Sequence, residues 1–387
     1  MGGVFARILK AIATILIALC LAILIVPHFL DRRYYDGPLS DHYNGQRFFN
    51  PGLDDTMAPP TGKSRGGFLW KFLSGESGRQ PWPYAVAVRP SKPAPRVMGD
   101  RMTAIWVGHA TVLIQTQGLN ILTDPIWAER AGPFGIGPKR VTQPGIAFAD
   151  LPKIDLILVS HNHYDHMDLD TIGRLWRRDR PLIVTSLGND TLIAKTGARS
   201  VALDWGQGID VRPGVRVAVT RNHHWSSRWF SDERRALWSS FVVQLPGGNI
   251  YFAGDTGYGD GNWPREALAY GPVRLALIPI GAFRFEPGMM RTGSHIGPIE
   301  AEEVFHRLQA SFAIPIHWGT FQLSNEARDT PPGILAEVMR CAGHARPEVF
   351  APQDIGRMID VPALQPASAR RPPQAACLAQ SNIDRFK

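Results

Sequence analysis

A seven-residue segment, Ser160-His-Asn-His-Tyr-Asp-His166, constrains this chain more than any other part of its sequence. The segment directly follows the largely apolar run 154–159, which predicts a strand that delivers these side chains to its carboxyl-terminal end. On an extended loop His161 and His163 point the same way, whereas Asp165 and His166 fall past the turn and can address a second ion. The segment therefore predicts a site for two metal ions.

Further candidate ligands follow other strand-like segments. Three such runs end in a candidate side chain: 215–220 in His223 or His224, 249–253 in Asp255, and 312–316 in His317. Spacing alone does not separate His223 from His224. Neutral imidazoles and carboxylates suit zinc, and two ions lie about 3.5–4 Å apart when a carboxylate bridges them. Asp255 is the predicted bridging residue.

The order of these residues, His-x-His-x-Asp-His followed by a lone His, a lone Asp and a last His, resembles the metallo-β-lactamase superfamily. Further motifs resemble its N-acyl-phosphatidylethanolamine-hydrolysing phospholipase D branch. They are Trp106-Val-Gly-His-Ala-Thr111, Leu122-Thr-Asp-Pro-Ile126, Gly137-Pro-Lys-Arg140, Ser160–His166, Phe252-Ala-Gly-Asp-Thr-Gly-Tyr258, Leu277-Ile-Pro-Ile-Gly-Ala282 and Ile316-His-Trp-Gly-Thr-Phe321. The resemblance covers roughly residues 100 to 355 and implies an αββα sandwich.

The resemblance also implies a ligand set. One zinc ion would bind His161, His163 and His224, a second would bind Asp165, His166 and His317, and Asp255 would bridge them. His224 is chosen over His223 because the family pattern places this histidine directly before a tryptophan, here Trp225. The other histidine would then support the ligands or lie at the surface.

His295 matches a family position beside the scissile phosphate. The local sequence departs from the family at Gly297, where relatives usually carry a small polar residue. The alternative for His295 is an ordinary histidine in a loop or at a helix amino terminus ahead of Pro298. We interpret His109 as structural, because it interrupts a strand-like stretch and the ligand count does not require it.

The chemistry expected of such a site is hydrolysis of a phosphodiester. Two zinc ions lower the pKa of a shared water, supply a hydroxide nucleophile at neutral pH and neutralise phosphodiester oxygens. Asp165 would ligate zinc and orient the hydroxide, while His295 and Tyr164 would hydrogen-bond the phosphoryl or departing oxygen. We expect Asp124 and Asp155 to hydrogen-bond ligating imidazoles or to act as structural acids at strand ends.

The length of 387 residues and the mixed pattern of strands and helices favour one catalytic domain, residues 101–360, with two packed sheets and flanking helices. Predicted strands lie at 103–116, 119–123, 154–159, 181–185, 215–220, 237–245, 249–253, 274–280 and 312–316. Predicted helices include Leu169–Arg178 and Pro298–Leu308.

The amino-terminal segment predicts a membrane anchor at residues 1–30. Residues 11–26 are almost wholly apolar, and with their apolar flanks they approach the roughly 20 residues that cross a bilayer. A cleaved signal is the alternative, but no small-x-small cleavage site follows the apolar core. Positive charge flanks both ends, and we favour an orientation that places the catalytic domain outside the cytoplasm, in the periplasm.

The segments that flank the predicted domain have less regular patterns. Residues 31–100 are rich in Pro, Gly and aromatic residues, which predicts an irregular extension packed on the domain, and within it residues 68–73 either pack or touch lipid. Residues 361–387 are expected to form a mobile tail. Cys341 and Cys377 can pair only if this tail folds back.

Charge and composition bear on the partners. The net charge of +8 fits attraction to anionic lipid headgroups and equally fits nucleic-acid binding. Because the positive charge is scattered and no nucleic-acid-binding module is evident, no nucleic-acid partner is expected. A homodimer is possible. The leading hypothesis is a membrane-anchored dinuclear zinc phosphodiesterase that converts N-acyl-phosphatidylethanolamine-like phospholipids to phosphatidic acid and N-acylethanolamine. The alternatives are a sugar-phosphate lactonase, a nuclease, and a non-catalytic anchored binding module.

Overall fold

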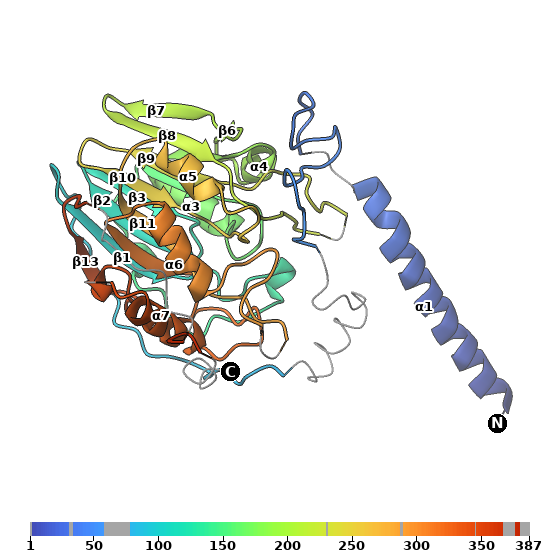
Figure 1. Ribbon diagram of the computed structural model, residues 1–387. Coiled ribbons are helices and arrows are strands. Elements are labelled where there is room, and N and C mark those ends of the chain that lie inside the picture. Colours follow the sequence, from blue (N-terminus) through green and yellow to red (C-terminus); the bar gives the residue numbers. More distant parts are fainter. Residues whose placement is uncertain are drawn as a thin grey trace.

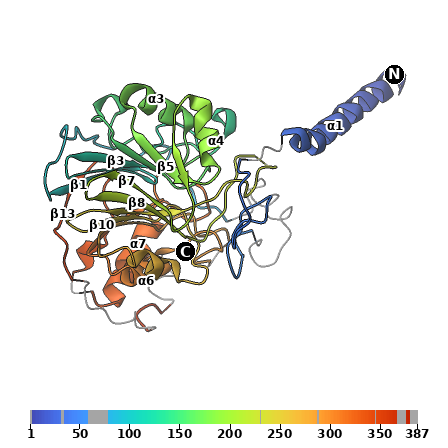
Figure 2. The same cartoon turned by 90° about the horizontal axis from the view of Figure 1, so that it is seen from above.

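Two β-sheets face each other, and helices cover the outer face of each sheet (Figures 1 and 2). The computed structural model describes residues 2–30, 34–57, 78–229, 231–286, 289–344, 346–366 and 376–379. The first sheet has the order β13 (Met358–Val361), β1 (Met102–Gly108), β2 (Thr111–Thr116), β3 (Leu119–Thr123), β4 (Leu156–Val159), β5 (Leu182–Ser186), β6 (Val201–Leu203). The second has the order β12 (Phe312–Ile316), β11 (Val273–Pro279), β10 (Asn249–Phe252), β9 (Ser240–Gln244), β8 (Val215–Thr220), β7 (Gly208–Arg212).

The topology of the second sheet brings distant candidate residues to one edge. Strands β8 and β10 both pair antiparallel with β9, so they run in the same direction. Strands β10, β11 and β12 are parallel to one another. The carboxyl ends of β8, β10 and β12 therefore meet at the same edge, and each is followed by candidate ligands.

Helices with one apolar face complete the layers. Helix α3 (Leu169–Asp179) begins where the Asp168 carboxylate accepts hydrogen bonds from the backbone N–H groups of Asp170 and Thr171. It buries Ile172 and Leu175 against the first sheet. Figure 2 shows α3 and α4 (Asn189–Ile193) on one side of the sheets, with α6 (Pro298–Arg307) and α7 (Thr330–Cys341) on the other. Helix α5 is the short segment Trp263–Leu268, and a buried apolar core lies between the two sheets.

The αββα sandwich is confirmed, although several elements differ from the prediction. The strand expected at 103–116 is a hairpin of β1 and β2 that turns at His109, which has a φ of 54°. Helix α7 was not predicted, because Pro331 and Pro332 at its start are residues that usually break a helix. Proline is tolerated in the first turn, where the backbone N–H groups have no intrahelical partner. Strands β6 and β13 are too short for their alternation to be read.

Helix α1 (Gly2–Leu30) is the one helix of the described residues that is long and apolar enough to cross a membrane. The described residues 34–57 and 78–100 of the extension contain isolated bridges but no helix or longer strand, and they pack on the domain. Residues 68–73, for which lipid contact was an alternative, lie outside the described residues.

The described parts of the expected mobile tail contact the domain. The Ser311 hydroxyl donates a hydrogen bond to the carbonyl of Gln365. Cys377 forms a disulfide with Cys341 at the end of α7, so this part of the tail does fold back.

Candidate metal centre

Three imidazoles from two loops form a first group of ligand atoms. His161 and His163 follow β4, and His224 follows β8. The His163 Nδ1 atom lies 2.8 Å from His161 Nε2 and 3.4 Å from His224 Nε2. The three candidate ligand atoms lie within 4.8 Å of one another.

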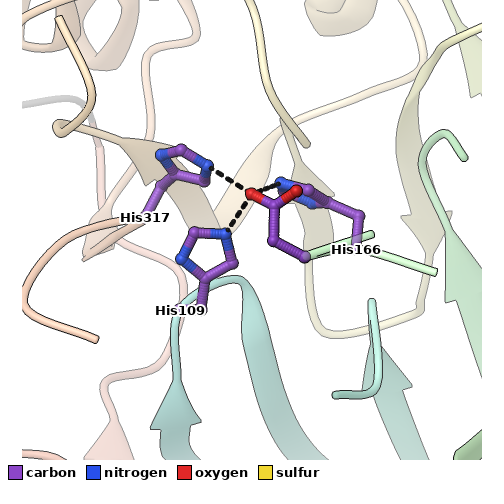
Figure 3. A group of neighbouring side chains, drawn as sticks. His109, His166 and His317 are labelled. Carbon is purple, nitrogen blue, oxygen red and sulfur yellow. Dashed lines mark hydrogen bonds and ion pairs between the residues drawn. The ribbon is translucent and has the colours of Figure 1, made fainter. Parts of the chain in front are cut away.

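A second group lies beside the first. Asp165 Oδ2 lies 3.4 Å from His166 Nε2 and 3.6 Å from His317 Nε2. The same oxygen lies 2.8 Å from Nε2 of His109, and Figure 3 shows the three imidazoles directed at one carboxylate. His109 therefore contacts the site through Asp165, and its interpretation as a supporting residue outside the ligand count stays a prediction.

Asp255 lies between the two groups. Its Oδ2 atom is 3.0 Å from Nε2 of both His166 and His317. It is 4.0 Å from His161 Nε2 and 3.9 Å from His224 Nε2. A single carboxylate oxygen thus faces ligand atoms of both groups, as a bridging position requires.

The arrangement of these side chains suits bound cations better than hydrogen bonds among the side chains themselves. His317 Nδ1 and Asp255 Oδ1 are buried without a hydrogen-bond partner among the described residues. The Nε2 atoms of His166 and His317 lie 3.0 Å from Asp255 Oδ2 but make no well-aligned hydrogen bond. Two ligands on one tetrahedral zinc ion, at bonds of about 2.0–2.2 Å, lie a little over 3 Å apart, close to most of the separations above. Buried polar groups without partners are costly, so these orphaned atoms indicate a site built to hold ions.

The electrostatics of the first group suit metal ligation. Burial and neighbouring imidazoles hold the pKa of His161 well below its ordinary value, and burial lowers the pKa of His163 to about 4. Burial likewise holds the pKa of His224 well below its ordinary value. Neutral imidazoles with a free lone pair are the form that binds a metal ion.

In the second group the carboxylates outweigh burial, so the pKa values of the imidazoles are raised. Burial disfavours a charged His317, but Asp255 and Asp165 outweigh this effect and raise its pKa to about 9. The pKa of His166 is raised well above its ordinary value by the same carboxylates, again against burial. Burial alone would raise the pKa of Asp165 and of Asp255, yet the adjacent imidazoles hold both well below the ordinary range. A bound cation would take the place of the protons that this concentration of negative charge attracts.

Neighbouring groups orient the imidazoles. Asp124 Oδ2 accepts a hydrogen bond from His166 Nδ1 at 2.7 Å, which turns Nε2 toward the site. The Ser294 carbonyl lies 2.9 Å from His224 Nδ1 and does the same for that ring. Asp155, in contrast, pairs with Arg96 at the far end of β4. Of the two roles expected for these acids, Asp124 has the first, a hydrogen bond to a ligating imidazole. Asp155 has the second and is a structural acid at a strand end.

The backbone is shaped to bring the two sheets together at the site. His109, Asp124 and His317 all have positive φ, which costs of order 1–3 kcal/mol for each such non-glycine residue. Gly254, with φ of 61°, lies so close to Ser160 that a Cβ atom would come within 2.7 Å of the Ser160 Cβ. Glycine at this position lets the Asp255 loop approach the histidine loop that follows β4.

The remaining predicted residues lie around the centre. His295 Nδ1 is 3.9 Å from Asp255 Oδ2, and its ring faces those of His224 and His317. Tyr164 lies with its ring against the Arg228 guanidinium, 3.8 Å from the ring centroid, and lines a pocket next to His163. A hydrogen bond from Tyr164 to substrate remains a prediction.

His223 and His224 point to different partners. His223 Nε2 lies 2.8 Å from Asp55 Oδ1 of the extension, outside the ligand groups. Asn50, also in the extension, donates a hydrogen bond to the carbonyl of His224. Sequence reasoning missed both extension residues, because a contact between segments more than 150 residues apart leaves no local signal.

The match to known proteins agrees with this fold and site. A family model described as "Beta-lactamase superfamily domain" matches residues 119–318, and the chain belongs to this superfamily. Within it, the chain belongs to the branch of the N-acyl-phosphatidylethanolamine-hydrolyzing phospholipases D. It is 35% identical to phospholipase D 1 of this type from Caenorhabditis elegans over 267 residues, which are 66% of this chain and 74% of the worm protein.

A second phospholipase D of this type also matches, and two solved structures share the fold. The mitochondrial N-acyl-phosphatidylethanolamine-hydrolyzing phospholipase D of Saccharomyces cerevisiae is 35% identical over 57% of this chain and 48% of its own length, so the match spans about half of the yeast protein. An isothiocyanate hydrolase from Delia radicum gut bacteria has the same fold, with a TM-score of 0.53, 19% identity and coverage of 68% of this chain and all of its own. A metallo hydrolase from Ignicoccus hospitalis is similar at a TM-score of 0.51 and 19% identity, over 67% of this chain and 97% of its own. The protein is a metal-dependent hydrolase.

Proposed function

We propose that this protein is a dinuclear zinc phosphodiesterase that hydrolyses N-acyl-phosphatidylethanolamine-like phospholipids to phosphatidic acid and N-acylethanolamine. The observation that carries the proposal is the position of Asp255 Oδ2, within 4.0 Å of imidazole nitrogens from both ligand groups. A structural zinc site is usually a closed cage of four ligands, whereas two ions that share seven ligands leave room for water and substrate.

In this proposal the chain holds two ions. His161, His163 and His224 bind one, Asp165, His166 and His317 bind the other, and Asp255 bridges them. Bound zinc ions would acidify a water molecule and neutralise phosphodiester oxygens. Asp255→Ala should therefore lose metal and activity together, as measured by elemental analysis and turnover of the same preparation, and a variant that keeps both would overturn the ligand assignment.

The protein's own side chains would direct the reaction. Asp165, whose Oδ2 is held by His109, would orient the attacking water. His295 would hydrogen-bond the departing oxygen, and its Nδ1 has no hydrogen-bond partner among the described residues. His295→Ala should lower kcat by roughly 10²–10⁴-fold with metal content unchanged, as expected for loss of a general acid. His223→Ala is the matched control, because His223 points to Asp55 instead.

The substrate class rests on the relatives that match at 35% identity. The decisive experiment measures products from N-acyl-phosphatidylethanolamine, a sugar-phosphate lactone and RNA, with and without a chelator. Hydrolysis in ¹⁸O-labelled water should place the label in phosphatidic acid and none in the N-acylethanolamine, because the bond from phosphorus to the departing oxygen breaks. Label in the alcohol, or turnover only of lactone or RNA, would refute the lipid assignment.

We further propose that α1 anchors the protein and that the catalytic domain lies outside the cytoplasm. The Cys341–Cys377 disulfide supports this orientation, since disulfides persist in oxidising compartments such as the periplasm. Cells quenched in acid and denatured should show one thiol reactive toward a maleimide, Cys20, and all three only after reduction. Three reactive thiols before reduction would argue for a cytoplasmic domain.

A further inference from the structure

Three large apolar side chains are exposed together at one place on the domain. Phe134 is 89% exposed, Ile136 70% and Trp229 41%. The rings of Phe134 and Trp229 lie 6.5 Å apart in an edge-to-face arrangement, although they come from loops almost a hundred residues apart. Single exposed apolar residues are ordinary, but a group of them at one opening indicates an interaction surface.

One of these side chains, Trp229, lines a pocket that reaches the metal centre, and the ring of Phe134 lies against Trp229. The pocket has a volume of about 500 Å³, and its lining includes Pro133 and Trp229 from the two loops. His163, a member of the first ligand group, lines the same pocket. Arg228 links this opening to the ligand loop, because its guanidinium donates hydrogen bonds to the carbonyls of Asn162 and Met167.

The end of the apolar helix α1 is tied to this place. Asp232 Oδ1 accepts hydrogen bonds from the backbone N–H groups of Arg228 and Trp229, each at 2.8 Å, and shapes the loop that carries Trp229. The other oxygen of Asp232 accepts a hydrogen bond from the Tyr34 hydroxyl at 2.7 Å. Helix α1 ends at Leu30, and the chain from there to Tyr34 can span at most about 14 Å.

The charges beside the exposed loop suit a lipid surface. The loop that carries Phe134 and Ile136 is closed by a bridge between Arg130 and Lys139. An apolar tip with basic residues at its base is the pattern of segments that lie in the interfacial region of a membrane. Glu129 pairs with Lys139 and offsets part of this charge.

We propose that Phe134, Ile136 and Trp229 form a membrane-docking rim that rests in the headgroup region of the bilayer anchoring α1. The pocket at His163 then opens onto the lipid surface, so a phospholipid reaches the metal centre without crossing water. The purpose of the rim rests on the proposed lipid hydrolase function, whereas its contact with the bilayer can be measured without any turnover.

The test places a reporter on the rim of the full-length protein in vesicles of phosphatidylethanolamine and phosphatidylglycerol. In a Cys20→Ser background, Ile136→Cys is labelled with an environment-sensitive fluorophore and exposed to lipids that carry a quencher near the headgroup. Met98→Cys is the matched control, because Met98 is 71% exposed and lies by the Gly118 turn, at the other end of β2 and β3 from the site. Lipid quencher should quench the label at 136 and leave that at 98 accessible only to aqueous iodide. Equal behaviour of the two labels would overturn the proposal.

A second measurement uses the double variant Phe134→Ser, Ile136→Ser. Loss of one large apolar side chain from an interface lowers occupancy by about tenfold, so turnover of bilayer substrate should fall by at least that factor. Turnover of detergent-dispersed substrate should not change, and Met98→Ser should leave both unchanged. Equal losses on both substrates would refute the rim, whereas an absence of lipid hydrolysis in the wild type would refute the proposed function and leave the quenching result to decide docking.

Discussion

Asp124→Asn should weaken metal binding while the protein still folds. Asp124 is fully buried and accepts three hydrogen bonds: from the backbone N–H of Ser160, from the Ser160 hydroxyl, and from His166 Nδ1. Asparagine has the same shape and can still accept from the Ser160 N–H with its carbonyl oxygen. Its NH₂ group would then face His166 Nδ1–H, donor against donor. The imidazole must move its proton to Nε2, which removes the lone pair that faces the site.

The size of the effect follows from the lost hydrogen bond. A hydrogen bond to a charged group contributes about 1.5–3 kcal/mol. At 1.4 kcal/mol for each factor of ten, metal affinity should fall by roughly 10–100-fold, the range usual for partners of metal-bound histidines. The assay is titration of metal-free protein with zinc in competition with a chromophoric chelator.

Asp155→Asn is the control for this experiment. Asp155 is also an acid beside a strand end and accepts a backbone hydrogen bond, from Asn120, but it lies at the far end of β4 from the site. Its variant should lower the midpoint of thermal unfolding and leave zinc affinity unchanged. Wild-type affinity in Asp124→Asn, or an equal loss in both variants, would refute the argument that Asp124 acts by orienting His166.

Three further predictions test other parts of the structure. His109→Ala should retain both metal ions but bind them about tenfold more weakly, since Asp165 loses the partner that holds it; loss of a whole ion would instead identify His109 as a ligand. Burial opposes a charged His42, but hydrogen bonds with Asp204 and Asp41 raise its pKa above 6.5. Its contribution to the free energy of unfolding is therefore full below pH 6.5 and declines as the pH rises through the higher folded-state pKa. The protection of residues 35–50 against hydrogen exchange, corrected for the intrinsic pH dependence of exchange, should fall over that rise, and His42→Gln should abolish this fall. Deletion of residues 1–30 should release the domain from the membrane, and the released domain should still bind metal, because no candidate ligand lies in that segment. Full-length protein in the soluble fraction with an intact amino terminus would refute the anchor.

Much of the metal site can be predicted from the sequence, because covalent spacing places four candidate ligands on one loop. His161, His163, Asp165 and His166 must lie close together wherever that loop goes. Asp255 and His317 follow apolar strands, and carboxyl ends of parallel strands meet at one edge, so their approach to the loop also follows from pattern. The family and the αββα fold, expected from the order of these motifs, are confirmed.

Only the tertiary structure decides what depends on partners far away in the chain. His223 and His224 are neighbours with the same chemistry, and their directions differ because Asp55 takes one ring and the carbonyl of Ser294 takes the other. His109 enters the site because the β1–β2 hairpin folds over Asp165. A side chain's direction is set by the groups that the fold brings against it, and the sequence near a residue does not contain that information.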